Sequence, residues 1–320
     1  MNSNEFRKYG KEMVDYVADF WDHIRERRPL PNIKPGYIKD VVPSNAPPEP
    51  EDWNTIFNDL EEVVMKGNTY WHHPHFFAYF PTACSYPALI ADILSGGIAG
   101  IGFSWKSGPA MTELEMATLD WLVDALALPE HFKNSHPGNG CGIIQCTASD
   151  ATMIAVMSAR AKAVEAEQEH ADILYPHFHD PAVFQNFVAY CSDQEDRARG
   201  LIPFILIATM GTTSSCGMDR LNELAPICNR EHIWLHVDAA YAGSFLTCPE
   251  FRYMFKDGVT VTKYFNVDAT YLKHEYQAVA ADYRHLQVAL GRRFRALKIW
   301  FVLRKLGVAY IQSLLRKVSF

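Results

Sequence analysis

Two continuous apolar runs, separated by a segment with helical character, constrain the fold of this chain most strongly. The runs cover residues 204–209 and 233–237, and each is typical of a strand that is buried on both faces of a sheet. Between them, residues 220–231 predict a helix, with Asp219 as its expected N-terminal cap. A strand, a helix and a second strand at this spacing form a βαβ unit. The sequence therefore predicts an α/β fold with a mainly parallel sheet flanked by helices.

The composition is that of a globular protein. Of the 320 residues, 48% are apolar and 21% are charged, which is enough apolar surface for a sizeable core. The formal net charge of −7 argues against a nucleic-acid partner. No apolar run reaches the roughly 18 residues that a membrane span needs, and the first residues do not form a secretory signal. The seven cysteines include no CxxC pair, so we expect a reduced, cytoplasmic protein that binds no membrane.

The first 85 residues predict a helical arm that is separate from the α/β part. In a helix over residues 3–26, apolar side chains recur at spacings of three and four, as in a helix that packs on another helix. Because a terminal helix has little of its own chain to cover it, we expect a subunit interface. A proline-rich connector over 28–50 and a second amphipathic helix over 51–66 follow. The predicted organisation is an N-terminal helical arm or dimerisation domain at 1–85 and a large α/β domain at 86–320. The packing seam consists of Phe6, Tyr9, Met13, Tyr16 and Phe20.

Three further features are predicted in the large domain. Thr112 and Glu115 have the spacing of a capping box at the start of a helix that Pro129 ends. A glycine-rich turn at 138–142 leads to another helix, which begins near Ser149. The basic stretch at 292–298 lies in a helical apolar pattern and is interpreted as a solvated or dimer-facing helix side.

Polar residues follow both predicted strands, at the edge where parallel sheets bind ligands. Thr213 follows the first strand, and Asp238 ends the second. Asp238 has two interpretations: a helix cap or structural hydrogen-bonding group, or a carboxylate that holds a positive charge on a ligand. A pyridinium nitrogen is the best-known ligand group of the second kind, because the ion pair keeps the ring protonated and able to accept electrons.

Another polar cluster, at residues 145–150, begins a predicted helix. Thr147 and Ser149 can cap this helix, and its free N–H groups and dipole favour a phosphate there. Taken alone, an ordinary N-cap has the same pattern. Together with Asp238, however, the cluster describes the two ends of one ligand, a phosphate and a protonated ring nitrogen. That ligand is pyridoxal 5′-phosphate (PLP).

Five motifs, in this order, resemble the aromatic L-amino-acid decarboxylases. These belong to the group II PLP-dependent decarboxylases, which also include insect-type aromatic acetaldehyde synthases. The resemblance covers nearly the whole chain and implies the type I, aminotransferase-like PLP fold. It also implies a homodimer with the active site at the subunit interface, and a place in catecholamine metabolism. The motifs are Tyr79-Phe80-Pro81-Thr82, Gly102-Phe103-Ser104-Trp105, and residues 236–243, 270–274 and 291–295.

The resemblance assigns roles to individual residues. It implies that Ala148 and Ser149 hold the cofactor phosphate and that Thr213 lies near the cofactor ring. Asp238 would pair with the ring nitrogen, and Ala240 would pack on the ring face. The implied substrate pocket consists of Trp71, Tyr79, Phe80, Thr82, Phe103 and Gly291.

Two of these motifs bear on substrate and product. Gly291 stands where histidine-specific members tend to carry serine, and a glycine leaves room for a catechol or indole ring. Tyr271 lies in the family's mobile catalytic loop and would return a proton to the substrate carbon after carbon dioxide leaves. Plant members that make aldehydes carry phenylalanine there. The resemblance therefore implies decarboxylation of an aromatic L-amino acid, such as L-DOPA or 5-hydroxytryptophan, to the amine.

The alternative within the family is an aromatic acetaldehyde synthase, which uses dioxygen and releases an aldehyde, ammonia and hydrogen peroxide. Ala269 replaces a usual proline in the loop that carries Tyr271, and this change keeps the alternative open. Insect-type synthases differ at the histidine that stacks on the cofactor ring. That histidine is not present in the sequence.

The sequence also lacks the family's Schiff-base lysine, which belongs in an Asn-Pro-His-Lys-like motif after the strand-end aspartate. Segments are missing near 194/195 and between 258 and 265, and the small C-terminal domain is absent as well. Either the sequence joins the ordered segments of a longer chain in its apo form, or the protein is a non-catalytic relative. The first explanation is favoured, because deleting two central strands would leave unpaired backbone groups in a buried sheet.

A metal site is not expected. His72, His73 and His75, with His177 and His179, could form one, but an aromatic pocket and a charged surface stretch explain them better.

Overall fold

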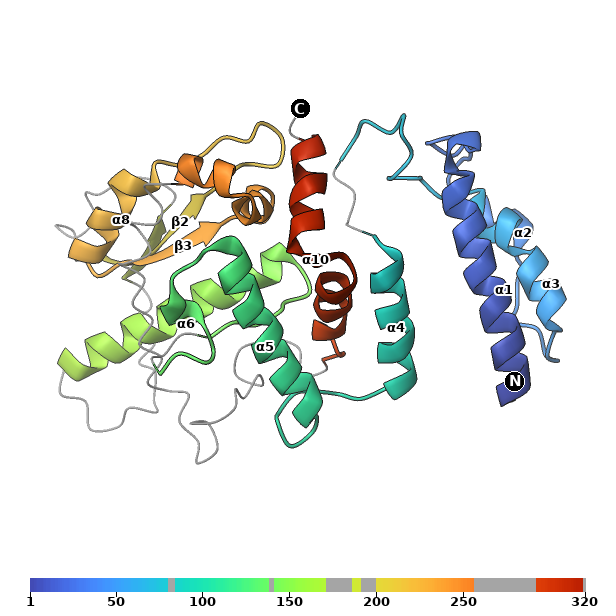
Figure 1. The fold of residues 1–320 in the computed structure, drawn as a ribbon, viewed down its shortest axis with the longest axis horizontal. Helices are drawn as coiled ribbons and strands as arrows, with labels where there is room; N and C mark the ends of the chain where they lie inside the picture. Colours follow the sequence, from blue (N-terminus) through green and yellow to red (C-terminus); the bar gives the residue numbers. More distant parts are fainter. Residues whose placement is uncertain (80–83, 138–140, 171–185, 191–199, 256–291, 319–320) are drawn as a thin grey trace. The chain divides into compact units, whose positions relative to one another are not determined.

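The computed structural model describes residues 1–79, 84–137, 141–170, 186–190, 200–255 and 292–318 (Figure 1). The chain divides into two compact units, Met1–Ala83 and Cys84–Phe320.

The first unit is helical. Helix α1 (Ser3–Asp22) begins at a capping box, in which the Asn2 side chain accepts a hydrogen bond from the Glu5 N–H and the Glu5 carboxylate accepts one from the Asn2 N–H. The predicted helix over 51–66 is instead two pieces, a short α-helix followed by a π-helical turn. The elements after α1 are η1 (Ile24–Glu26), α2 (Ile38–Val41), α3 (Trp53–Asn58) and η2 (Leu60–Met65).

The aromatic seam of α1 packs on its own chain. Tyr9 stacks on Trp53 with ring centroids 4.8 Å apart, and Tyr16 meets Phe57 edge-on at 5.5 Å. The expectation that this helix has little of its own chain to cover it was therefore wrong for most of the seam. Phe6, at the start of the seam, is 63% exposed.

A charged network closes the far end of this seam. Arg27 donates to both carboxylate oxygens of Glu61, at 2.9 and 2.7 Å, and its guanidinium lies 5.5 Å from the ring centroid of Phe20. The Tyr16 hydroxyl donates to Glu61 at 2.7 Å. Burial, together with this bond to a carboxylate, raises the pKa of Tyr16 to about 12.

The second unit contains the predicted parallel sheet. Its strand order is β1-β2-β3, and both pairs are parallel. Ile205 pairs with Trp234 and Thr209 with Asp238, so the βαβ prediction is confirmed. The described strands and the helix between β2 and β3 are β1 (Phe187–Tyr190), β2 (Ile202–Thr209), α8 (Leu221–Arg230) and β3 (Trp234–Asp238).

Helices cover both faces of the sheet, as the continuous apolar runs require (Figure 1). Ile205 and Ile207 face α6 (Ala148–His170), where Ala159 belongs to the same apolar cluster. Leu206 and Ala208 belong to the cluster on the other face, with Ala225 of α8 among its members. Alternate residues of β2 thus point to opposite layers.

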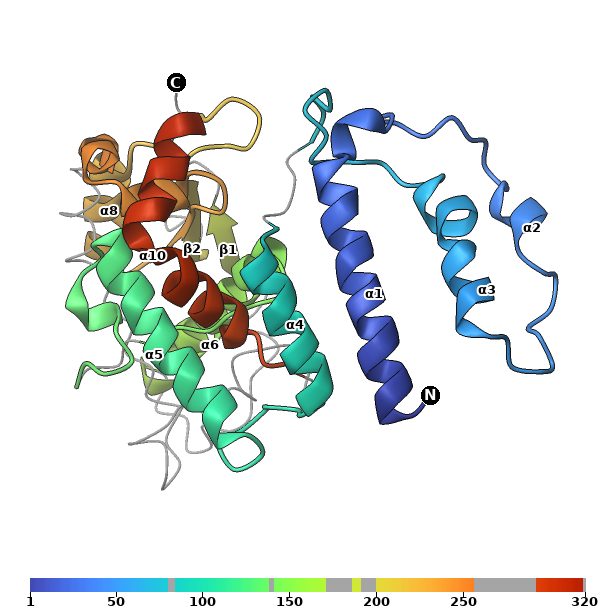
Figure 2. The ribbon, with the colours of Figure 1, turned by 45° about the vertical axis from the view of Figure 1, so that its right-hand side comes forward.

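A second group of helices packs beside the sheet. Helix α10 is bent at Gly307, whose φ of 75° and ψ of 157° are not helical. Figure 2 shows its two parts, the first beside α4. Ala91 of α4, Met111 of α5 and Leu297 of α10 share one buried cluster. The remaining elements are α4 (Tyr86–Ile98), α5 (Pro109–Leu126), η3 (Glu130–Phe132), η5 (Ala242–Thr247), η6 (Pro249–Phe255) and α10 (Ala296–Val318).

The predicted capping box at Thr112 is wrong. Helix α5 begins at Pro109, directly after Gly108, so Thr112 and Glu115 lie inside the helix and are buried. Proline is favoured in the first turn because its fixed φ suits a helix and no hydrogen bond is lost there. Glu115 instead forms a buried ion pair with Arg292.

Two smaller predictions are also corrected. Asp219 does not cap α8 through its side chain. Its carboxylate accepts the N–H of Thr209 at 2.7 Å and so ties the end of β2 to the start of the helix. The basic stretch at 292–298 begins before α10, and Arg292 in it is 3% exposed and paired, not solvated.

Candidate functional site

The carboxyl ends of β2 and β3 meet at one edge of the sheet, and Asp238 stands there. The N–H of Met210, just past β2, donates to the Asp238 carbonyl oxygen at 2.8 Å, so the two strand ends are locked together. One carboxylate oxygen, Oδ1, accepts the N–H of Ala240 at 3.0 Å. Among the described residues, Oδ2 has no hydrogen-bond partner. The local bond orients the carboxylate and leaves one oxygen able to receive a proton donor of a ligand.

The loop after β2 lies at the same edge. Gly211 has a φ of +81°, and a Cβ built on it would lie 2.4 Å from the Cβ of Ala242. A glycine is needed at this position for both reasons. The Thr212 hydroxyl is bonded to the Ser215 hydroxyl and to the Gly217 N–H, each at 2.9 Å. This turn exposes Thr213 to solvent beside the strand ends.

The start of α6 supplies donors suited to an anion. Thr147 caps the helix: its hydroxyl accepts the Asp150 N–H at 3.0 Å and its carbonyl accepts the Ala151 N–H at 3.1 Å. Ala148 and Ser149, the first two helical residues, are exposed. Their N–H groups belong to the helix end that carries the positive pole of the dipole, so this turn suits a phosphate.

One hydrogen bond joins α6 to β3 and places the two halves of the site. The Thr152 hydroxyl, one helical turn after Ala148, lies 3.2 Å from Nε2 of His236. His236 stands two residues before Asp238 on β3. Burial lowers the pKa of His236, and the charge of Asp238 opposes this shift. Burial therefore favours the neutral imidazole, which links helix and strand.

The segment that leads into α6 is held by charged side chains for which the sequence predicted other roles. Ile144 N–H donates to Glu115 Oε1 at 2.8 Å, and Arg295 Nη1 donates to the Ile144 carbonyl at 2.5 Å. The side chain of Arg292 pairs with Glu115. The carbonyl oxygen of Arg292 accepts the N–H of Gly102 at 3.1 Å. Phe103, which follows Gly102, is half-buried.

The predicted aromatic residues of the first unit come together. Trp71 and Tyr79 stack with ring centroids 5.1 Å apart, and Phe76 lies 6.0 Å from Trp71. Tyr79 is 74% exposed and has a φ of 57°, in the left-handed region that tyrosine rarely adopts. Non-glycine residues in that region cluster at functional sites.

Several predicted site residues lie outside the described part of the chain. They are Phe80, Thr82, Tyr271 and Gly291, together with His177 and His179 of the histidine set.

The remaining histidines of that set have local partners. His73 is buried, and its Nδ1 accepts the His75 N–H at 3.0 Å. His72 meets Trp21 edge-on at 5.1 Å. Within the residues described, no group of three or more His, Cys, Asp or Glu side chains could hold a metal ion.

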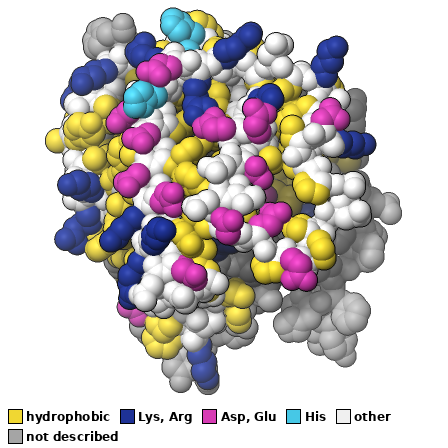
Figure 3. All heavy atoms as spheres, turned by 90° about the vertical axis from the view of Figure 1, so that its right-hand side faces the viewer, with side chains coloured by type: hydrophobic (Ala, Val, Ile, Leu, Met, Phe, Trp, Pro, Cys, Tyr) yellow, Lys and Arg dark blue, Asp and Glu magenta, His cyan; other side chains and the backbone are white. Residues whose placement is uncertain are grey.

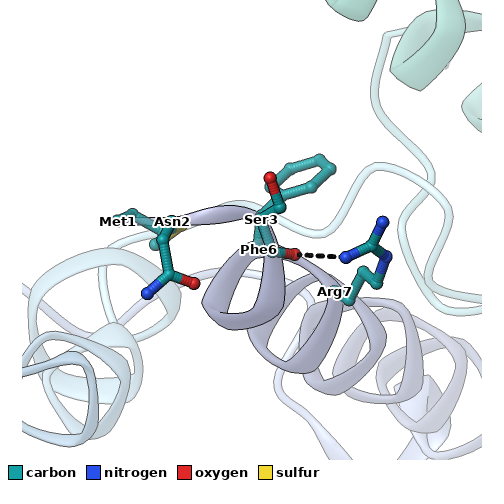
Figure 4. A pocket seen from close by; sticks show the side chains of 5 residues that line it. All are labelled: Met1, Asn2, Ser3, Phe6 and Arg7. Atoms are coloured by element: carbon teal, nitrogen blue, oxygen red, sulfur yellow. Dashed lines mark hydrogen bonds between the residues drawn. The ribbon is translucent and has the colours of Figure 1, made fainter.

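A hollow at the start of α1 is lined by Met1, Asn2, Ser3, Phe6 and Arg7 (Figure 4). Arg7 donates to the Ser3 carbonyl at 3.4 Å. The lining contains no imidazole, thiol or carboxylate, so it has no acid–base pair for catalysis. It belongs to the first unit, whereas Asp238 and α6 belong to the second.

None of the helices that the structure describes combines the length and the apolar character that crossing a bilayer would require.

The donor set of the second unit fits PLP at its two ends. A helix start with exposed N–H groups and hydroxyls suits the phosphate, and a strand-end carboxylate with one available oxygen suits a protonated ring nitrogen. The Thr152–His236 bond joins the helix and the strand that carry these two ends. The Asn-Pro-His-Lys-like motif that carries the family's Schiff-base lysine does not occur in the sequence.

The chain is similar to known decarboxylases in both sequence and structure. The chain is 43% identical to the aromatic-L-amino-acid decarboxylase of Mus musculus, over 99% of this chain and 79% of the mouse protein. It superposes on the tryptophan decarboxylase of Catharanthus roseus with a TM-score of 0.85 and 31% identity, over 99% of this chain and 78% of that one. For the 4-hydroxyphenylacetaldehyde synthase of Rhodiola rosea, the TM-score is 0.83 and the identity 29%, over 99% and 77% of the two chains.

The sequence model of the pyridoxal-dependent decarboxylase conserved domain matches in three pieces, at residues 35–198, 194–260 and 253–319. Neighbouring pieces overlap at residues 194–198 and 253–260. These matches cover most of the chain. The chain belongs to the pyridoxal-dependent decarboxylase family.

Proposed function

We propose that this protein is a PLP-dependent carboxy-lyase that decarboxylates an aromatic L-amino acid, of the L-DOPA or 5-hydroxytryptophan type, to its amine. The observation that carries the proposal is the placement of Asp238 and the start of α6, linked through Thr152 and His236, within a chain 43% identical to a mammalian aromatic-L-amino-acid decarboxylase.

The residues of the second unit offer groups for both ends of the cofactor. The Ser149 hydroxyl and the N–H groups at Ala148 and Ser149 would hold the phosphate, next to the Thr147 cap. Asp238 Oδ2 would accept a hydrogen bond from the protonated ring nitrogen, while Thr213 and Ala240 would flank the ring. When bound, PLP supplies the electron sink for cleavage of the carboxylate bond. The task of Asp238 is to keep the ring nitrogen protonated.

The aromatic side chains would select the substrate. Trp71 and Tyr79 offer stacked rings, and the family resemblance adds Phe103 to this set. Phe80, Thr82 and Gly291 would complete the pocket, and the absence of a side chain at Gly291 would leave room for a two-ring substrate. Ring faces and an apolar wall favour an aromatic side chain over a charged one.

The proposed product is the amine, with Tyr271 as the proton donor to the substrate carbon. The mouse decarboxylase is 43% identical to this chain and the Rhodiola rosea aldehyde synthase 29%. An assay with L-DOPA that measures dopamine and hydrogen peroxide together tests the choice. Dopamine without peroxide is expected, and peroxide in equal amount to the product would contradict it.

The proposal requires the Schiff-base lysine, and its motif is not found in the 320 residues. The alignment with the mouse protein spans 384 positions although the chain has 320 residues, so at least 64 positions of the relative face no residue of this chain. We propose that the sequence joins segments of a longer chain. The lysine segment would belong at the break near 253–260, and the ring-stacking histidine at the break near 194–198.

Intact mass separates this proposal from a non-catalytic relative. A mass well above 36.3 kDa, with a change in the visible absorbance of added PLP, is expected for the purified protein. A mass near 36.3 kDa with unchanged PLP absorbance would favour the non-catalytic relative.

We further propose a cytoplasmic homodimer in which residues 1–85 form the dimerisation arm and residues 86–320 the cofactor-binding domain. Exposed apolar side chains support this assembly: Val14 on α1 is 53% exposed and Ile93 on α4 is 57% exposed. Figure 3 shows one face of the molecule, on which apolar side chains reach the surface between charged ones. Sedimentation at micromolar concentration would test the dimer, and a monomer would contradict it.

A further inference from the structure

A buried ion pair holds the segment that leads into α6. Glu115 and Arg292 are 2% and 3% exposed and bond to each other. Glu115 Oε1 also accepts the Ile144 N–H at 2.8 Å, and Arg292 Nη2 donates to the Ile144 carbonyl at 3.3 Å. Both backbone polar groups of Ile144 are therefore bonded to one ion pair.

Arg295 holds the same segment a second time. Its Nη1 donates to the Ile144 carbonyl at 2.5 Å, and its Nη2 lies 3.1 Å from Cys146 Sγ. Cys146 directly precedes Thr147, which caps α6. The guanidinium thus fixes the chain within one residue of the turn that offers its N–H groups to a phosphate.

The arrangement is hard to explain by stability alone. A buried ion pair is costly to desolvate, and a well-packed apolar pair of similar volume often stabilises a fold equally well. Here one further bond of Glu115 and one of Arg292 reach the same residue, Ile144, which lies three residues before the helix cap. Charged donors and acceptors also form the shorter and stronger hydrogen bonds, which fix geometry closely.

We propose that Glu115, Arg292 and Arg295 are positioning residues for the cofactor phosphate. By fixing residues 144–146, they set the direction in which the first N–H groups and the Ser149 hydroxyl of α6 point. The carbonyl of Arg292 extends this link to Gly102, next to Phe103. The inference rests on the proposed function, because it requires that a phosphate binds at this turn.

Pyridoxal, which has the cofactor ring without the phosphate, isolates the predicted effect. Arg295→Met keeps the apolar stem and removes both donors. PLP should bind about tenfold more weakly to this variant, a change similar in size to the free energy of one charge-assisted hydrogen bond. Pyridoxal affinity should stay unchanged. Arg295→Lys can reach only one acceptor, so its PLP affinity should lie between those of the unsubstituted chain and Arg295→Met.

Glu115→Gln gives a second test from the opposite side of the segment. It should also lower the preference for PLP over pyridoxal. It leaves the buried Arg292 cation without its counter-charge, so it is compared only after its circular dichroism matches that of the unsubstituted chain. Arg295 itself is half-exposed, so its variants can be compared without first matching their circular dichroism.

Lys298→Met is the matched control. Lys298 lies three residues after Arg295 and forms an exposed ion pair with Asp92 at 2.7 Å. This pair does not touch residues 144–149, so its loss should change neither affinity.

Hydrogen exchange gives a readout that needs no ligand. In the ligand-free chain, the amides of residues 144–150 should exchange faster in Arg295→Met than in Lys298→Met. A PLP-to-pyridoxal affinity ratio that is the same in Arg295→Met and the unsubstituted chain would overturn this inference and leave the proposed function intact. If the unsubstituted chain showed no preference for PLP, the proposed phosphate site would fall, and this inference with it.

Discussion

The hydroxyl of Thr152 lies 3.2 Å from Nε2 of His236, and this contact joins the helix that starts at the phosphate-type turn to the strand that ends at Asp238. PLP has its phosphate and its ring nitrogen at fixed separation. A site for it must therefore hold a helix start and a strand end in fixed relation. A single side-chain contact between a hydroxyl and an imidazole contributes to that relation here.

Thr152→Val removes this contact and keeps the shape of the side chain. We expect a loss of about 1 kcal/mol in the free energy of unfolding, the usual value of one hydrogen bond, together with weaker PLP binding. Urea unfolding and PLP titration measure the two effects. Thr118→Val is the control, since among the described residues the Thr118 hydroxyl bonds to two carbonyls of its own helix, at 2.8 and 3.2 Å, and to no group of the sheet. Equal PLP affinity in both variants would refute the coupling.

His236 predicts how stability changes in mild acid. Burial lowers its pKa below the ordinary value of 6.5, against the opposing charge of Asp238. The unfolded chain therefore binds this proton more readily, so the stabilisation is complete above pH 6.5 and is lost as the pH falls through the folded pKa. Unfolding free energies measured across this range should fall less steeply for His236→Gln. Identical slopes for the two proteins would show that His236 does not titrate differently on folding.

Asp238→Asn tests the ring-nitrogen contact. Asparagine retains an oxygen for the Ala240 N–H, so the local turn should persist, but the negative charge is lost. PLP affinity should fall by about 10- to 100-fold, the cost of a hydrogen bond to a charged group. The PLP analogue in which carbon replaces the ring nitrogen should bind the variant and the unsubstituted chain alike. A similar loss for both compounds would mean that the substitution disturbs the fold instead.

Gly211→Ala should destabilise the turn that carries Thr213. The new Cβ would meet the Cβ of Ala242 at 2.4 Å, in addition to the cost of a φ of +81°. Gly307→Ala is matched to it, because Gly307 has a φ of +75° and, in the part of the chain that the structure describes, its Cβ position has no atom within 4 Å beyond its own neighbours and helix backbone. We expect about 1 kcal/mol of destabilisation for Gly307→Ala and 1–3 kcal/mol more for Gly211→Ala. Equal melting temperatures for the two variants would disprove the predicted clash.

Tyr16 predicts an alkaline loss of stability in the first unit. Burial and the bond to Glu61 raise its pKa from 10.0 to about 12, so the folded chain keeps the phenol protonated where the unfolded chain releases it. This contribution is complete below pH 10 and is lost as the pH rises toward 12. Unfolding measured over this range should show a smaller pH dependence for Tyr16→Phe. An unchanged dependence would assign the alkaline transition to other groups.

The sheet edge could be predicted from the sequence because its signals are local. Two buried apolar runs with a helix between them specify parallel neighbours, and parallel neighbours bring Thr209 and Asp238 together. Thr147 caps α6 as its residue type predicts.

The partners of Glu115 could not be predicted in this way. Thr112 and Glu115 have the spacing of a capping box, yet Arg292, the partner of Glu115, lies 177 residues further along the chain. No local pattern distinguishes a carboxylate that caps its own helix from one that pairs with a distant cation. The better local signal was Gly108 followed by Pro109, which marks the true start of α5. The same limit applies to Asp219, whose carboxylate serves the Thr209 N–H of β2.

The bend at Gly307 gives one stretch of chain two separate attachments. Before the bend, α10 follows Arg295 and packs on α4 and α5 through Leu297. After it, Gln312 donates to the Thr247 carbonyl at 2.6 Å, close behind β3. A continuous helix would force both attachments to open together. A corner with non-helical backbone angles lets them open one at a time, so the phosphate end and the ring end of the site can lose order in separate steps.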